Sequence, residues 1–325
     1  MQSTEGDNNT PIEVDYQTTG DESYEDRLSA YSASLTSSVT NYRHENGRRY
    51  HAYDDGRYLL PNDEHEQDRL DIHHALCKQI LDGKLLLAPI ENPQRVLDLG
   101  TGTGIWAIEF ADQYQSAEVI GCDLSPVQPA WVPPNVQFYI DNIEKDWNYE
   151  SPFDFIHARY LAVAMEDYAG LVKKAYQHVK PGSWVEFQDW DQYPFSEDKT
   201  LENTNMEKYF AEVIGAFAEK GYEASPGPKL EHYFKAAGFQ DVHVEKFRVP
   251  LGIWPKSPHL KTIGTWMMLQ GEEGYEAGAM AILTRYKGWS EDEVRVLVDK
   301  TRKDAKDRDI HTQFHFYVVY GRKPE

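Results

Sequence analysis

Apolar and polar residues follow two different periods along this chain, and each change of period marks a predicted element. Apolar positions recur at helical spacing over 64–81, and Gly83 directly afterwards suits a helix end. Helical spacing also occurs at about 104–113 and at 171–179. Short apolar runs typical of buried strands lie at 95–100, 117–123, 136–140, 153–157 and 184–188. Strands that alternate with helices predict a parallel sheet covered on both faces by helices.

The pattern after residue 191 predicts helices inserted between the last two strands. Strand candidates at 242–251 and 314–320 enclose helical stretches at 260–269, at 275–286 and from Ser290 to about 302. Ser290 is a good N-cap, and the acidic residues after it favour a helix N-terminus. We expect this helical material to cap the crevice at the ends of the sheet strands.

The chain of 325 residues has 33 Lys+Arg against 54 Asp+Glu, a net charge of −21. A nucleic-acid binder needs a basic face to displace phosphate counterions, so direct nucleic-acid binding is not expected. Adhesion to anionic lipid is not expected either. Residues 1–38 are polar and acidic without apolar periodicity, and we interpret them as a disordered acidic tail.

The cysteines and the N-terminus indicate the compartment. Cys77 and Cys122 form no CxxC pair and lie in apolar surroundings, which predicts two buried free thiols. The N-terminus lacks the basic start and apolar core of a signal peptide, and no apolar run has the length of a membrane span. We therefore expect an intracellular protein without membrane attachment, in the cytoplasm or the nucleus.

A glycine-rich turn links the first apolar strand to the following helix. In VLDLGTGTG, Gly100, Gly102 and Gly104 follow Asp98 at alternate positions, which lets the backbone approach a ligand closely. The segment 102–107 satisfies the GxGxx(G/A) dinucleotide pattern, and Asp123 closes the second strand at a distance suited to a ribose contact. On these residues alone NAD remains an alternative, as does a purely structural turn.

Asp98 favours a different cofactor. Its carboxylate at the strand end would repel a pyrophosphate, whereas it would attract the ammonium group of S-adenosylmethionine. Asp123 is placed to accept hydrogen bonds from both ribose hydroxyls, and Asp141 and Asn142, after the third strand, suit an adenine amino group. We therefore infer S-adenosyl-L-methionine as the cofactor.

Four segments in order, VLDLGTGTG, GCDLSP, FDFIHARYL and HVKPGSWVEFQDWD, resemble the successive motifs of class I S-adenosylmethionine-dependent methyltransferases. Segments 42–53, 61–74, 283–290 and 318–324 resemble the fungal LaeA-like methyltransferases, so the resemblance covers roughly residues 40–324. It implies an α/β fold with a doubly wound, Rossmann-like, seven-stranded and mostly parallel sheet. It also implies a fungal protein that methylates secondary metabolites or regulates their gene clusters. Ser183 departs from the more usual KPGGW.

These observations divide the chain into the tail, 1–38, and one methyltransferase domain, 39–325. Within the domain we expect an N-terminal helical segment or lid at 39–93, a cofactor-binding core at 94–190, and a substrate cap with the C-terminal strands at 191–325. The N-terminal segment often closes the site in this superfamily. The predicted cofactor contacts are Asp98, Gly100, Thr101, Gly102, Gly104, Asp123, Leu124, Asp141, Asn142, Ile143, His157, Tyr50 and Tyr58.

His157 is the candidate catalytic base, because it ends the fourth strand beside the crevice and imidazole accepts protons near neutral pH. A purely structural histidine is the alternative. Arg159 is expected to form an ion pair with Asp154 or Glu186 rather than to bind an acidic substrate.

Acidic, histidine and apolar residues near the predicted crevice allow three further predictions. At least two of Glu186, Asp189 and Asp191 are expected on a solvated rim. His73 and His74 lack further ligands at zinc spacing, so no metal site is predicted. Trp266, Met267 and Met268 suit either an adaptable acceptor pocket or an ordinary core.

The sequence therefore predicts a methyltransferase acting on a small secondary-metabolite acceptor, with O-methylation slightly preferred. One alternative is a regulator of secondary metabolism that works through protein partners. A second is a fold that retains the cofactor but performs non-methylating pericyclic or cyclisation chemistry.

Overall fold

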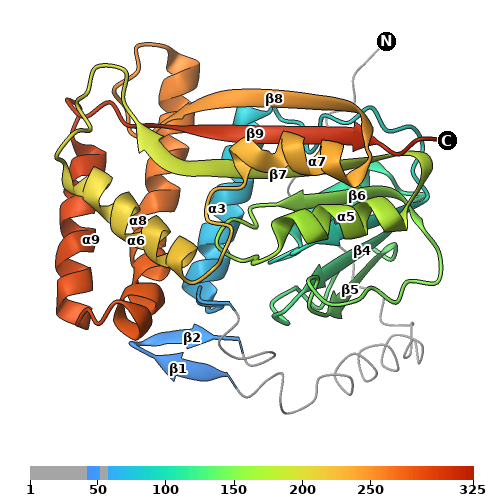
Figure 1. Cartoon of the computed structure of the whole chain (residues 1–325), viewed down its shortest axis with the longest axis horizontal. Helices are drawn as coiled ribbons and strands as arrows, with labels where there is room; N and C mark the ends of the chain where they lie inside the picture. Colours follow the sequence, from blue (N-terminus) through green and yellow to red (C-terminus); the bar gives the residue numbers. More distant parts are fainter. Residues whose placement is uncertain (1–41, 52–57) are drawn as a thin grey trace, which may run out of the picture.

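The computed structural model describes residues 42–51 and 58–325, so the predicted tail, 1–38, lies outside the described residues. Its main sheet has seven strands in the order β5-β4-β3-β6-β7-β9-β8 (Figure 1). β9 alone runs opposite to the other six strands, so the predicted seven-stranded, mostly parallel sheet is confirmed. The strands are β3 (Arg95–Leu99), β4 (Glu118–Asp123), β5 (Val136–Ile140), β6 (Phe153–Arg159), β7 (Val179–Phe195), β8 (Gln240–Pro250) and β9 (Gln313–Arg322).

Helices cover both faces of this sheet. Successive residues of a strand point to opposite faces, so each buried strand contributes to a core on either side. On β3, Leu97 and Leu99 pack in one core with α5 (Tyr168–His178) and α7 (Leu230–Ala237). Val96 packs in another core with α4 (Ile105–Gln113). Both faces of these strands are apolar, which explains why the strands appear in the sequence as continuous apolar runs.

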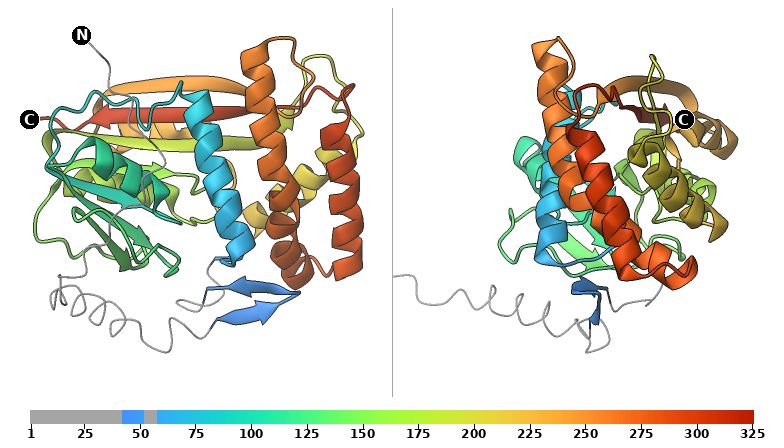
Figure 2. Two further views of the ribbon diagram at one scale, coloured as in Figure 1. Left: turned by 180° about the vertical axis from the view of Figure 1, so that it is seen from behind. Right: turned by 90° about the vertical axis from the view of Figure 1, so that its left-hand side faces the viewer.

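A third core lies at the end of the sheet toward which the parallel strands run. It joins α6 (Asn205–Glu219), α8 (Pro258–Tyr286) and α9 (Glu291–Lys306) to α3 (Glu64–Ile80), as Figures 1 and 2 show. α9 begins with a capping box between Ser290 and Glu293. As predicted, α8 and α9 lie between the last two strands, β8 and β9. We refer to α6, α8 and α9 together as the cap. A short 3-10 turn (Gly227–Lys229) precedes α7.

α8 is one helix of 29 residues, so the predicted interruption between 269 and 275 was wrong. Two glycines within α8 serve close packing. A Cβ at Gly274 would lie 3.3 Å from Arg69 Cδ on α3, and a Cβ at Gly278 would lie 3.2 Å from Tyr209 Oη on α6. Glycine therefore lets neighbouring side chains approach the helix axis, and packing outweighs its low helix propensity.

The N-terminal segment contains a hairpin in addition to its predicted helix. β1 (Arg43–Glu45) pairs with β2 (Arg48–Tyr50) across Asn46-Gly47, where both residues have positive φ. Glu45 forms an ion pair with Arg285 of α8 at 2.6 Å, which fixes the hairpin beneath the cap. Over 42–51 and 58–325, no helix is long and apolar enough to cross a membrane.

Candidate active site

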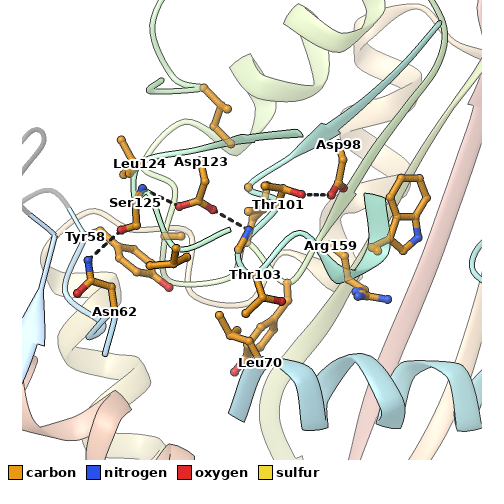
Figure 3. Close-up of a pocket in the computed structure, with 18 of the residues that line it drawn as sticks. Tyr58, Asn62, Leu70, Asp98, Thr101, Thr103, Asp123, Leu124, Ser125 and Arg159 are labelled. Atoms are coloured by element: carbon orange, nitrogen blue, oxygen red, sulfur yellow. Dashed lines mark hydrogen bonds between the residues drawn. The ribbon is translucent and has the colours of Figure 1, made fainter. Parts of the chain in front are cut away.

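A cleft opens at the carboxyl ends of β3, β4, β5 and β6, and the N-terminal segment and α3 form its other wall (Figure 3). The structure brings most of the predicted cofactor residues together along this cleft. Those that line it are Tyr58, Asp98, Gly100, Thr101, Gly102, Asp123, Leu124, Asp141, Asn142, Ile143 and His157.

The glycine turn needs its glycines for two reasons. Gly100, Gly102 and Gly104 all have positive φ, at 65°, 57° and 80°. A Cβ at Gly100 would also lie 2.5 Å from Leu161 Cδ2, and one at Gly104 would overlap the Phe138 ring. Gly104 is the N-cap of α4 and does not line the cleft. Its role is therefore in the conformation of the turn, and the geometry gives its predicted contact with the cofactor no support.

Asp98 is buried at the end of β3 and is held on both of its oxygens. Its Oδ2 accepts a hydrogen bond of 2.5 Å from the Thr101 hydroxyl, and its Oδ1 lies 2.7 Å from His157 Nδ1. The carboxylate is therefore fixed in one orientation beside the cleft. A fixed carboxylate at this position suits the ammonium group of the cofactor.

Asp123 is fixed by backbone groups. Its two oxygens accept hydrogen bonds from the amides of Gly102 (2.8 Å) and Ser125 (2.9 Å), and burial raises its pKa. Figure 3 shows Asp123 between these loops on the side of the cleft opposite Arg159. Each carboxylate oxygen has a further lone pair, so these bonds leave room for the predicted ribose contacts.

His157 is fully buried at the end of β6. Its ring stacks on Trp106 with centroids 3.7 Å apart, and its Nδ1 faces Asp98. Burial lowers its pKa, opposed by the hydrogen bond to Asp98. This geometry favours a positioning role for His157, and its role as a base stays a prediction.

Tyr50 and Tyr58 occupy different surroundings. Tyr58 lines the cleft, whereas Tyr50 is buried in the cap core with Arg285 4.8 Å from its ring centroid. Tyr50 is not among the residues that line the cleft, so the geometry gives its predicted cofactor contact no support.

Sequence reasoning missed Asn62 as a site residue. Its side-chain amide donates to the Ser125 hydroxyl at 3.2 Å, which joins the N-terminal segment to the loop after β4 (Figure 3). Asn62 lies directly before the N-cap of α3, Asp63, and only the tertiary contact reveals its role.

Arg159 lines the cleft, and its predicted ion pair was wrong. Its Nη2 lies 2.7 Å from His74 Nδ1. Asp154, one proposed partner, pairs with Lys180 at 2.7 Å instead. Glu186, the other, accepts from the amides of Leu87 and Ala88. Arg159 is thus a cation on the cleft wall near Asp98.

The expected solvated rim of acids was also wrong. Glu186 and Asp189 are fully buried, and burial raises the pKa of each to about 7. Asp189 accepts hydrogen bonds from the amides of Leu161 and Ala162, from the Tyr168 hydroxyl and from the Trp190 amide. Both carboxylates hold backbone segments in place through these hydrogen bonds. Because most of these segments are distant in the sequence, the sequence alone does not indicate this role.

A second cavity adjoins the cleft beneath the cap. Glu66, His73 and Tyr160 line both cavities and form the boundary between them. The remaining wall comes largely from α6, α8 and the far end of β7, and it includes Met267 but neither Trp266 nor Met268. Among the described residues no group of three or more His, Cys, Asp or Glu side chains is placed to hold a metal ion.

Comparison with known proteins shows the family to which the chain belongs. Residues 70–244 match the family described as methyltransferase domain. The chain is 42% identical over 294 residues to the methyltransferase PytC of Aspergillus terreus, covering 90% of this chain and 91% of that protein. It is 37% identical to the secondary metabolism regulator LAE1 of Cochliobolus heterostrophus (88% and 96% covered). It is 32% identical to the protein-methionine methyltransferase LaeA of Emericella nidulans (90% and 79% covered).

The matched family region includes the complete glycine turn and the strand ends that line the cleft, and the cofactor is S-adenosylmethionine. The chain belongs to the class I S-adenosylmethionine-dependent methyltransferases, in the group that contains PytC and LaeA.

Proposed function

We propose that this enzyme transfers the methyl group to a small-molecule acceptor of secondary metabolism bound in the second cavity. The observation that carries the proposal is the shared boundary of Glu66, His73 and Tyr160 between the cofactor cleft and that cavity. Because the two cavities share these side chains, an acceptor in the second cavity would lie next to a cofactor in the cleft. Holding two reactants next to each other in the right orientation supplies much of the acceleration in a displacement reaction.

The chain's own residues orient both partners. Asp98 would hold the ammonium group of the cofactor, Asp123 its ribose, and Asp141 with Asn142 its adenine. When bound, the cofactor supplies a methyl carbon on a cationic sulfur. The acceptor atom forms a bond to that carbon while the carbon–sulfur bond breaks, and the sulfur keeps the bonding pair. S-adenosylhomocysteine is the product, and the proton of a hydroxyl acceptor passes to water.

Oxygen is the acceptor atom that the boundary favours. The Tyr160 hydroxyl accepts a hydrogen bond of 3.3 Å from Arg69, and its own proton is available to a second acceptor. A hydroxyl donor beside a cation suits an oxygen atom better than a carbon or sulfur atom, because oxygen is the stronger hydrogen-bond acceptor. O-methylation is therefore our preferred reaction.

The names of two relatives support a second candidate, a regulator that methylates a protein. One relative is a secondary metabolism regulator and another a protein-methionine methyltransferase. The second cavity favours a small molecule instead, because buried aromatic and aliphatic side chains of the cap core form its wall.

Mass spectrometry separates these functions. The protein is incubated with S-adenosylmethionine and a fungal metabolite extract, or with fungal protein extract in a parallel reaction. We expect S-adenosylhomocysteine and a metabolite heavier by one methyl group in the first reaction. A methylated protein without a methylated metabolite would establish the second candidate, and cofactor binding without turnover in either reaction would overturn both.

A further inference from the structure

Arg69 is a buried cation in the wall of the second cavity. Its side chain is 3% exposed, and it forms a two-pronged ion pair with Glu66, from Nε at 2.8 Å and from Nη2 at 2.6 Å. A third hydrogen bond runs from Nη1 to the Tyr160 hydroxyl. The guanidinium therefore lies next to two of the three residues at the boundary between the cavities.

These three bonds use three of the five guanidinium N–H groups. No hydrogen bond within the described part of the chain accounts for the other two. A buried donor without a partner is costly, so structures normally satisfy such groups with protein, water or ligand. Because Arg69 lines the second cavity, these two N–H groups remain for an acceptor atom of a molecule bound there.

The charges in the cavity wall indicate that the bound molecule is neutral. Glu66 and Arg69 are its only carboxylate and cation among the described residues, and they neutralise each other. Burial keeps the pKa of His73 well below its usual value, so its ring is neutral near pH 7. An anionic or cationic ligand would lose its hydration without an opposite charge in return.

Aromatic side chains form much of the remaining wall. They include Trp190, Phe210, Phe217 and Phe314, from β7, α6 and β9. Gly271, Gly274 and Gly278 of α8 also line the cavity and add no side chains of their own. A wall rich in aromatic rings suits an apolar aromatic molecule, which stacks on such rings or meets them edge to face.

We propose that the second cavity binds a neutral, planar aromatic acceptor with an oxygen atom that accepts a hydrogen bond from Arg69. This inference rests on the proposed function and adds the chemical class of the acceptor. It makes Arg69 a specificity-determining residue, because the guanidinium, already neutralised by Glu66, selects a hydroxyl or carbonyl oxygen over a carboxylate.

Three probes test the inference on the wild-type protein saturated with S-adenosylhomocysteine. They are 2-naphthol, naphthalene without the oxygen, and 6-hydroxy-2-naphthoate with an added carboxylate, and equilibrium dialysis measures their Kd values. We expect 2-naphthol to bind about 10-fold more tightly than either of the others, because it alone keeps the charge-assisted hydrogen bond without a buried charge. Equal binding of all three, tighter binding of the naphthoate, or no binding of 2-naphthol would overturn the inference.

Variants then locate the binding. Arg69→Lys keeps a cation beside Glu66 but loses the planar fork, so its Kd for 2-naphthol should rise about 10-fold while its affinity for S-adenosylhomocysteine stays unchanged. Arg302→Lys is the matched control, since Arg302 joins α9 to the Glu272 carbonyl outside both cavities. If folded Arg69→Lys binds 2-naphthol as the wild type does, Arg69 is not the anchor.

If Arg69→Lys does not fold, a second pair of variants tests where 2-naphthol binds. Met267→Trp narrows the cavity and should weaken 2-naphthol binding, whereas Met268→Trp next to it should not. If the two substitutions changed the Kd of 2-naphthol equally, 2-naphthol would not be bound in the second cavity. The metabolite-extract reaction reports on the proposed function separately: a methylated metabolite without probe selectivity overturns only this inference, and selective binding without any turnover overturns only the function.

Discussion

Tyr160 stacks on His73 with ring centroids 4.0 Å apart, and this pair forms part of the wall shared by the two cavities. Tyr160 has a φ of 59°, a conformation that is unfavourable for a bulky residue. The amides of Leu161 and Ala162 donate hydrogen bonds to the Asp189 carboxylate, and the Tyr160 amide donates to the Gln188 carbonyl. These bonds stabilise this backbone. A buried carboxylate thus sets the position of a boundary residue without touching either cavity.

The first prediction concerns cofactor affinity. Asp98→Ala should abolish measurable binding of S-adenosylhomocysteine in calorimetry, because it removes the carboxylate that we propose as the partner of the ammonium group. Asp123→Ala should weaken binding about 10-fold through lost ribose hydrogen bonds. Asp198→Ala is the control, because this exposed aspartate pairs with His311 away from the cleft. Unchanged affinity in both site variants would refute the assignment of the cleft.

The second prediction separates two roles of His157. If His157 positions Asp98, His157→Ala should weaken S-adenosylhomocysteine binding about 10-fold, because Asp98 loses the partner at 2.7 Å. A catalytic base would instead leave this affinity near that of the wild type and would change the pH profile of kcat. The exposed histidine variant His232→Ala should alter neither quantity.

The third prediction concerns stability against pH. Burial, with Arg159 next in effect, lowers the pKa of His74 from 6.5 to about 4. Between these values the unfolded chain binds a proton that the folded protein does not, so stability is fully present above pH 6.5 and falls as the pH falls toward 4. His74→Asn should remove about 3 kcal/mol of this pH dependence in urea unfolding. His232→Asn should retain it, and equal pH curves for all three proteins would contradict the assignment.

The fourth prediction compares two glycine substitutions. Gly104→Ala should lower the free energy of unfolding by about 1–3 kcal/mol, because Gly104 has positive φ and its Cβ would meet the Phe138 ring. Gly215→Ala in α6 meets no atom within 4 Å and should raise stability by about 0.5–1 kcal/mol. Urea unfolding measures both changes. A stable Gly104→Ala protein with intact cofactor binding would show that the turn tolerates a side chain.

Local signals predicted the sheet well, because its buried strands are continuous apolar runs and its glycine turn has a distinct pattern. The hairpin was missed even though Asn46-Gly47 is a strong turn signal, since strands of three residues show no clear alternation. The helical stretches predicted at 260–269 and 275–286 are one helix, α8, and only the tertiary structure shows that it is continuous.

The position of Asp98 and Asp123 at the cleft was predictable, because both lie at the ends of buried strands. Contacts with a distant segment were not predictable. Glu186 appeared to be a surface acid, yet two of its hydrogen-bond donors, the amides of Leu87 and Ala88, lie about a hundred residues earlier. The second cavity needs side chains from α3, α6, α8, β7 and β9, and no single segment of the sequence indicates it.

The central claim is that an acceptor in the second cavity receives the methyl group. The most direct measurement is the initial rate of S-adenosylhomocysteine formation with fungal metabolite extract, for the wild type, Met267→Trp and Met268→Trp. We predict turnover by the wild type, a fall of at least about 10-fold in Met267→Trp as the cavity narrows, and a normal rate in Met268→Trp. Equal rates in the two variants, or no metabolite methylation by any of the three proteins, would contradict the claim.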